Sequence, residues 1–277
     1  MTNEVIEWYD YFCKMIRTSA IIVCALFSLQ VSGQIRIAKL ILKPKEVYEL
    51  KESDILVVDT LIMMDSSKII LNKLKRDNFI HAKGAIFYRG SMIEGKGVHG
   101  IKGRNGRNGT SSSSPCTDGG PGSSATEGTH GRTGTNLALY FSDIKFKGPL
   151  IIDVSGGDAG DGGIGGLGGG GGQGTRPCKG GNGGQGGTGA KGGNGGNGGT
   201  VAFIAPRIPE MRSMLGVQII IRNYAGNLGL GGSGGAGGFS GLSPVGDSKM
   251  DGKMGRKGLK GKDGVQGKPG AISFQDK

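Results

Sequence analysis

Two cysteines, Cys116 and Cys178, are the residues whose chemistry the sequence indicates most directly. Each lies in a short polar stretch that contains proline, TSSSSPCTD for the first and TRPCK for the second. In an oxidising compartment we expect these thiols to form a disulfide, provided that the fold brings them together. The alternatives are two free thiols, or a metal site with His99 or His130, for which the sequence shows no ligand spacing.

No other residues form a catalytic motif that the sequence supports. No Gly-Lys pair is followed by serine or threonine, and no HExxH occurs. Gly-rich motifs match by chance in a chain with 60 glycines among 277 residues, so such matches carry no weight. We therefore expect a protein without catalytic activity, cofactor or metal.

The glycines keep a three-residue register. GGX units run from Gly156 to Gly172 and from Gly180 to Gly199, interrupted at glycine positions only by Ala159 and Ala190. A flexible linker has no reason to keep such a count. Residues 229–241 form a third GGX run, and runs of the GXY type with glycine at every third position cover residues 97–109, 119–134, where Ala125 takes one glycine position, and 252–270.

A three-residue repeat matches polyproline-II geometry, with three residues per turn and a rise of about 3.1 Å per residue. Such a helix has no internal hydrogen bonds, so its backbone N–H groups must bond to neighbouring segments, which glycine allows to approach closely. The runs form three pairs, and short polar connectors favour antiparallel hairpins. We expect the GGX runs inside the bundle and the GXY runs at its periphery. The connectors are residues 110–118, 175–179 and 242–251.

Between the glycine runs lie segments that alternate apolar and polar residues, as half-buried strands do. A short helix is expected at Pro209 and the residues after it. The predicted fold is mostly β with polyglycine-II helices: a solenoid-like β base carrying six antiparallel polyglycine-II helices in three hairpins. The disulfide would then join two hairpin tips. The expected strands lie in residues 54–94, 136–146, 149–154, 201–205, 216–225 and 271–275.

Residues 15–34, MIRTSAIIVCALFSLQVSGQ, are typical of a secretory signal peptide that is cleaved before Gln34. The alternative is an uncleaved membrane anchor, although the apolar run is shorter than the roughly 20 residues that a span needs. We expect a secreted or outer-surface protein with no membrane span after cleavage. The predicted domains are an upstream extension plus signal peptide (1–33), an N-terminal β region (34–96), and a glycine-rich bundle interleaved with strands (97–277).

The glycine hairpins resemble the polyglycine-II sandwich of the tail-fibre tip adhesins of T-even-like phages, and the snow flea antifreeze protein. The leader and base resemble glycine-rich, collagen-like secreted proteins of the Bacteroidetes type. In the phage adhesins the loops at the far end bind the host receptor, which implies that the three connectors are the contact surface here. The candidate ligand contacts are Ser114, Asp118, Arg176, Lys179, Asp247 and Lys249.

We therefore expect a monomeric structural or adhesive surface protein. The last glycine run is rich in lysine and arginine, and this basic face could hold an anionic polysaccharide or cell-surface component, or could simply be solvated. Nucleic acid is not expected, because the chain shows no known binding motif. The alternatives are a collagen-like trimeric matrix protein, which sedimentation would distinguish from a monomer, and an ice-binding protein.

Overall fold

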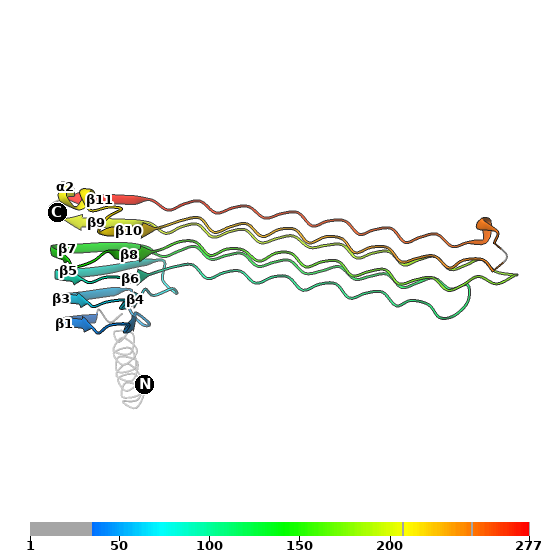
Figure 1. Ribbon diagram of the computed structural model, residues 1–277, viewed down its shortest axis with the longest axis horizontal. Coiled ribbons are helices and arrows are strands. Elements are labelled where there is room, and N and C mark those ends of the chain that lie inside the picture. The colour runs from blue at the N-terminus through cyan, green and yellow to red at the C-terminus, as the bar shows by residue number, and fades with distance from the viewer. Residues whose placement is uncertain (1–34, 207, 245, 277) are drawn as a thin grey trace, which may run out of the picture.

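The computed structural model describes residues 35–206, 208–244 and 246–276, and shows a β base from which long glycine-rich segments extend (Figure 1). The predicted leader, residues 1–33, lies outside the described residues. Within the described ranges, no helix has the length and apolar character needed to cross a bilayer.

The base consists of two parallel β sheets, and the chain alternates between them so that odd-numbered strands form one sheet and even-numbered strands the other. The prediction of a mostly β chain is confirmed. The first sheet contains, in order, β1 (Ile35–Leu42), β3 (Ile55–Met63), β5 (Asp77–Phe87), β7 (Asn136–Phe146), β9 (Val201–Ala205) and β11 (Ile272–Asp276). The second contains β10 (Ile219–Arg222), β8 (Leu150–Asp153), β6 (Ser91–Glu94), β4 (Lys68–Ile70) and β2 (Val47–Glu49).

The hydrophobic core lies where alternate side chains of both sheets turn inward. Leu56, Ile80, Leu139 and Phe203 pair across four neighbouring strands, and each is 0% exposed. Burying a side chain of this size stabilises the fold by about 1.5–3 kcal/mol. The core therefore repeats from one strand to the next along the stack.

Two short helices interrupt this pattern. The helix α2 (Ile208–Ser213) connects β9 to β10, and its Met211 is buried in the core cluster. This confirms the short helix predicted near Pro209. The 3-10 helix η1 (Ser248–Met250) lies in the third connector.

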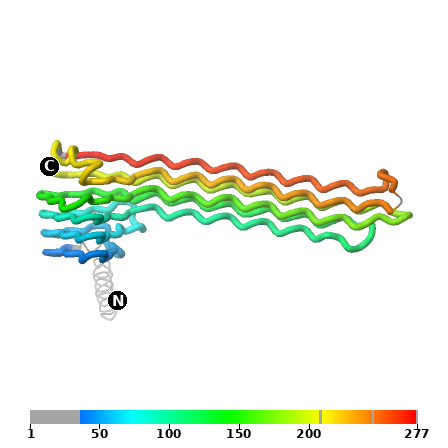
Figure 2. The backbone as a smooth tube through the Cα atoms, in the orientation of Figure 1, coloured from blue at the N-terminus to red at the C-terminus, as the bar shows by residue number. Residues whose placement is uncertain are grey.

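Six glycine-rich segments, assigned to neither helix nor strand, run side by side away from the base (Figure 2). Segments 1, 3 and 5 follow β6, β8 and β10, and we call them the outgoing layer. Segments 2, 4 and 6 lead into β7, β9 and β11, and form the returning layer. The segments are 1 (97–109), 2 (119–134), 3 (156–172), 4 (180–199), 5 (226–241) and 6 (252–270).

Hydrogen bonds between the segments form a regular lattice. In segment 3, Gly165 N–H donates to Ser233 of segment 5 over 2.9 Å, and Gly166 N–H donates to Ser123 of segment 2 over 3.0 Å. The same segment accepts bonds from segments 1 and 4. Segments 3 and 4 each bond to four neighbours, segments 2 and 5 to three, and segments 1 and 6 to two. Both segments with four neighbours carry the GGX repeat, because a side chain on an enclosed face would separate the backbones. The GGX repeat also predicts segment 5 inside the bundle, but this segment has only three neighbours, as the GXY segment 2 does, so that part of the prediction is wrong.

One register runs without a slip from the strands into the glycine segments. Asp77 of β5 pairs with Asn136 of β7, and Ser91 of β6 pairs with Leu150 of β8, both 59 residues apart. Beyond the strands, His99 accepts a bond from the N–H of Asp158, again at a separation of 59. The predicted boundary at residue 96 thus falls where segment 1 begins, while strands on both sides of it share the same two sheets.

Glu94 lies at the junction of β6 and segment 1, between two ammonium groups. Lys68 Nζ lies 2.7 Å from Glu94 Oε2, and Lys73 Nζ lies 3.1 Å from Oε1. Burial alone would raise the pKa of Glu94, but the hydrogen bonds and charges of these lysines outweigh it, and the pKa lies below its ordinary value. The ionised carboxylate is therefore more stable in the folded chain than in the unfolded one.

Replacing Glu94 with glutamine is expected to lower the free energy of unfolding by about 1 kcal/mol at neutral pH. Because the folded pKa is depressed, this contribution is complete above the unfolded-state pKa and is lost as pH falls through the folded pKa. Denaturant unfolding between pH 7 and pH 2 checks this. The native chain and Glu94→Gln should converge at the acid end, whereas a constant difference at all pH values would contradict the assignment.

Candidate functional site

The three connectors meet at the far end of the molecule from the base (Figures 1 and 2). Hydrogen bonds join them. The N–H of Cys116, in the first connector, donates over 2.9 Å to the carbonyl of Gln173, two residues before the second connector. Gln173 Oε1 accepts a 3.1 Å bond from the N–H of Leu242, at the start of the third connector. This end of the molecule, which we call the tip, is therefore one connected surface.

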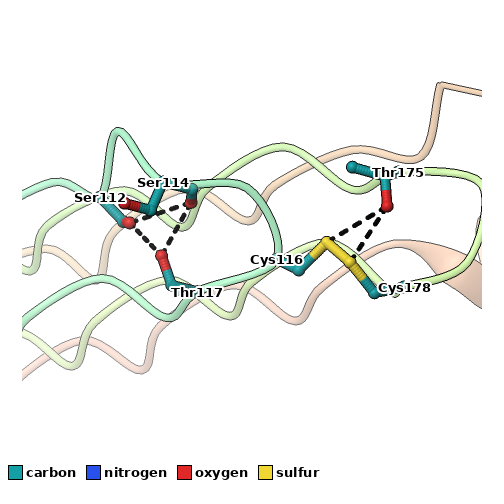
Figure 3. Close-up of a disulfide and its surroundings, with 6 residues drawn as sticks. All are labelled: Ser112, Ser114, Cys116, Thr117, Thr175 and Cys178. Atoms are coloured by element: carbon teal, nitrogen blue, oxygen red, sulfur yellow. Dashed lines mark hydrogen bonds between the residues drawn. A yellow bond between two sulfur atoms is a disulfide. The ribbon is translucent and has the colours of Figure 1, made fainter.

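A disulfide between Cys116 and Cys178 links the first two connectors, as predicted (Figure 3). The two Cα atoms lie 6.0 Å apart, within the usual range for a disulfide. Thr175 Oγ1 lies 3.1 Å from Cys178 Sγ and 3.7 Å from Cys116 Sγ. The structure thus ties together two turns that are 62 residues apart in sequence.

The six predicted contact residues are all exposed at the tip, but they differ in their partners. Asp118 Oδ1 accepts a 2.6 Å bond from the N–H of Asn182, so its carboxylate helps hold segments 2 and 4 together. Asp247 Oδ1 accepts from the N–H of Lys249 over 3.0 Å and caps η1. Arg176, Lys179 and Lys249 have no ion pair in the part of the chain that the structure describes.

Ser114 stabilises the first connector through its backbone carbonyl. Its carbonyl accepts bonds from Thr117 Oγ1 at 2.8 Å and from Ser112 Oγ at 3.2 Å, and the two hydroxyls also contact each other (Figure 3). These bonds shape the first connector into a compact turn. The Ser114 side chain itself is exposed.

On the outer faces of the bundle, polar side chains accept hydrogen bonds from backbone N–H groups of neighbouring segments. At the third position of a repeat, an Asn, Asp or His side chain accepts a hydrogen bond from the backbone N–H of the matching residue in the next parallel segment. In the returning layer Asp118 accepts from Asn182, and Asn182 Oδ1 accepts from Lys253 over 2.8 Å. His130 Nδ1 likewise accepts from Asn194 over 2.7 Å. Backbone N–H groups that would otherwise face solvent are thereby bonded within the chain.

Both layers expose large apolar side chains: Val98, Ile101, Ile164, Leu167, Leu230 and Phe239 on the outgoing layer, and Met254, Leu259 and Val265 on the returning layer. The returning layer also carries amides and cations on its outer face. Segments 2, 4 and 6 contain no Phe, Tyr or Trp.

A groove crosses the returning layer next to the tip. It encloses about 1010 Å³, including its open mouth. Asp118 and Pro121 line it from segment 2 and the adjoining connector, and Gly119, Gly183, Gly184 and Gly255 form its floor. The remaining side chains in the groove are Asn182, Gln185, Lys253, Met254 and Arg256.

Sequence reasoning noted the basic last run but did not predict this groove. Its walls come from three segments that are separated by 64 and 71 residues, as the bonds Asp118–Asn182 and Asn182–Lys253 show. The signal that could have found it is the register itself, because adding these separations to residue 121 gives Gln185 and Arg256.

Two exposed carboxylates elsewhere have lowered pKa values. The backbone N–H of Gly231, followed by the charge of Lys260, holds the pKa of Asp263 below its ordinary value. A hydrogen bond and the charge of Lys83 do the same for the pKa of Asp59 on the base. Both are ordinary surface ion pairs.

Among the residues with described positions, no three potential metal ligands gather at one place. Comparison of the chain with known protein families, curated proteins and solved structures gives no match.

Proposed function

We propose that this chain is a secreted or cell-surface structural and adhesive protein without catalytic activity. A β-solenoid base carries six antiparallel polyglycine-II helices in three hairpins, and the connectors at the tip bind a surface partner. The disulfide supports an oxidising location outside the cytoplasm, because structural disulfides persist in such compartments.

The hydrogen-bond lattice supports the polyglycine-II assignment. Donor glycines recur at every third residue, for example Gly226, Gly229 and Gly232 of segment 5, whose N–H groups donate to segment 4 over 2.8–3.0 Å. Within the segments, glycine N–H groups bond to neighbouring segments, which is the behaviour expected of a helix with three residues per turn. Because these glycine N–H groups bond within one chain, association into a trimer is not needed to bond them.

The single observation that carries the adhesive function is the gathering of all three connectors at one disulfide-linked tip. Loops held on a rigid scaffold, far from the body of a protein, are where binding residues concentrate. The tip also carries exposed cations, among them Arg176, Lys179 and Lys249, that have no ion pair with described residues. A rod with this construction holds a small contact surface away from its attachment point.

Exchanging the first connector, 110–118, and the third, 242–251, for glycine-serine turns of equal length is expected to reduce surface attachment about tenfold, because the contact residues are removed. Cys116 is retained in the exchanged turn so that the disulfide is preserved. Attachment of the fluorescently labelled full chain to the envelope of the source cell, and of unrelated cells, is the measurement.

The matched control is an exchange of the turn between β6 and β5, residues 88–90, at the opposite end of the molecule, which should leave attachment unchanged. If both exchanges leave attachment at the native level, the tip is not the contact surface and the adhesive role is wrong.

A further inference from the structure

We infer that the groove beside the tip, on the outer face of the returning layer, is a binding site for the anionic groups of an acidic polysaccharide. This inference uses the polyglycine-II geometry of the proposed function, but it does not depend on whether the connectors are adhesive. The site is formed by Gln185, Lys253 and Arg256 on a glycine floor.

The side-chain bonding of this face is interrupted from the groove onward. The row on its tip side is closed, since Asp118 accepts from Asn182 and Asn182 accepts from Lys253. In the next row the corresponding residues are Pro121, Gln185 and Arg256. Pro121 offers no side-chain acceptor, and the backbone N–H groups of Gln185 and Arg256 have no acceptor among the described residues. Beyond the groove, the backbone N–H groups of Thr188, Leu259, Lys191 and Lys262 also lack an acceptor among the described residues, and the bonding resumes where His130 accepts from Asn194.

Hydrogen-bond donors therefore collect in the groove. Besides the two backbone N–H groups, the groove contains three donor side chains: the amide of Gln185, the ammonium of Lys253 and the guanidinium of Arg256. Neither Lys253 nor Arg256 has an ion pair with any residue that the structure describes. The Asp118 carboxylate also lines the groove and accepts bonds from Asn182, at 2.6 Å from the backbone N–H and 3.3 Å from the side-chain Nδ2. Lys253 and Arg256 outnumber this one carboxylate, so the charge of the groove remains positive. A groove with this balance favours a carboxylate or sulfate, which accepts but does not donate.

Cations continue along the same face at multiples of one repeat. Lys253 and Arg256 are three residues apart, and Lys262 and Lys268 follow at intervals of six. At a rise of about 3.1 Å per residue, the spacings are about 9 Å and twice that. An acidic glycan with one carboxylate on every second ring carries its charges at a comparable repeat.

Nucleic acid fits this face less well. Each strand of a duplex presents a phosphate about every 3.4 Å along the axis, so the cations could meet only a fraction of them. Binding of single strands normally adds aromatic side chains on which bases stack. Segments 2, 4 and 6 provide none.

The test is binding of the full chain to hyaluronan, which carries one carboxylate per disaccharide, measured by calorimetry at low and physiological salt. Dextran sulfate tests whether sulfate is accepted as well, neutral dextran tests the need for charge, and duplex DNA tests the competing partner. The double variant Lys253→Gln with Arg256→Gln should weaken hyaluronan binding about tenfold or more. Gln185→Ala, which changes no charge, should weaken it about threefold.

The matched control is Lys102→Gln with Arg104→Gln. It removes one lysine and one arginine from segment 1, where both are exposed and which makes no hydrogen bond to segments 4 or 6. This control should change hyaluronan binding less than about twofold. An equal loss in both double variants, tighter binding of DNA than of hyaluronan, or no binding of any polyanion would overturn the inference. Because the connectors stay intact, loss of polysaccharide binding here is distinguishable from loss of attachment in the connector exchange.

Discussion

Replacing Gly169 with alanine is expected to lower the free energy of unfolding by about 2–4 kcal/mol. Gly169 is buried in segment 3, and a methyl group there would lie well under 3.0 Å from the carbonyl group of Thr110. Both atoms of that carbonyl belong to the backbone, so no flexible side chain can move aside. The segments would have to separate, and the 2.8 Å bond from Gly169 N–H to Gly120 would weaken.

The adjacent glycine provides the control. Gly170 occupies the outward position of the same repeat, and a methyl group there would meet nothing closer than Ser111 Oγ at 3.6 Å. Gly170→Ala should therefore change the free energy of unfolding by less than about 1 kcal/mol, with a small gain from reduced freedom in the unfolded chain. Denaturant unfolding of both variants, with amide exchange of segments 1 to 4, gives the comparison. Equal destabilisation by the two substitutions would show that the glycine register has no packing role.

Three alanines of the native chain indicate how far the lattice can yield. Ala125 and Ala190 stand at glycine positions, and their N–H bonds measure 3.0 Å; the bond from Gly163, beside them, measures 3.1 Å. Ala159 keeps a 2.9 Å bond. Bonds of 3.0–3.1 Å also occur at native glycines such as Gly160 and Gly267, so these alanines keep ordinary lattice bonds. Because single methyl groups are accommodated at these positions, the expected cost of Gly169→Ala is a few kcal/mol and does not amount to complete unfolding.

Serine and threonine of segment 2 stand at the repeat position that faces segment 1, the segment at the edge of the bundle. In segment 2, Thr126 Oγ1 accepts a 2.7 Å bond from the N–H of Arg104, and Thr129 Oγ1 accepts a 2.6 Å bond from Ile101. These hydroxyls bond N–H groups of segment 1 that have no further segment beside them. The GXY repeat at this edge therefore has a specific chemical reason, which is side-chain hydrogen bonding across the pair.

Much of the base could be predicted because its signals are local. Alternation of apolar residues indicated strands at 136–146 and 201–205, which match β7 and β9, and the residues after Pro209 indicated α2. The order of the strands could not be read in this way. Parallel neighbours such as Phe203 and Leu139 are 64 residues apart, and this separation depends on the length of an entire glycine hairpin.

The candidate sites differ in the same respect. The disulfide could be predicted because Cys116 and Cys178 lie in connectors whose positions follow from counting hairpins. The groove could not, because Gln185 and Arg256 become neighbours only when the register across three segments is known. The three-residue periodicity shows which backbone N–H groups bond to neighbouring segments. Which side chains meet in a surface groove depends instead on the number of residues that separates one segment from the next.

Replacing Cys116 and Cys178 together with serine is expected to give the other large effect, a loss of up to about 4 kcal/mol in the free energy of unfolding. In the chain-entropy model, a cross-link that closes a loop of this length restricts the unfolded chain by about that amount, and the bond joins residues 62 apart. The folded tip should remain assembled, because Cys116 N–H bonds to Gln173 and segments 3 and 4 bond along their whole length.

Denaturant unfolding with and without dithiothreitol measures this effect. Reduction should destabilise the native chain to the level of the double serine variant and should leave that variant unchanged. An equal response of both proteins to the reductant would mean that it acts elsewhere. If the double variant unfolded at the same denaturant concentration as the native chain, the cross-link would add nothing to the lattice. In that case the hydrogen bonds between the segments alone would hold the tip together.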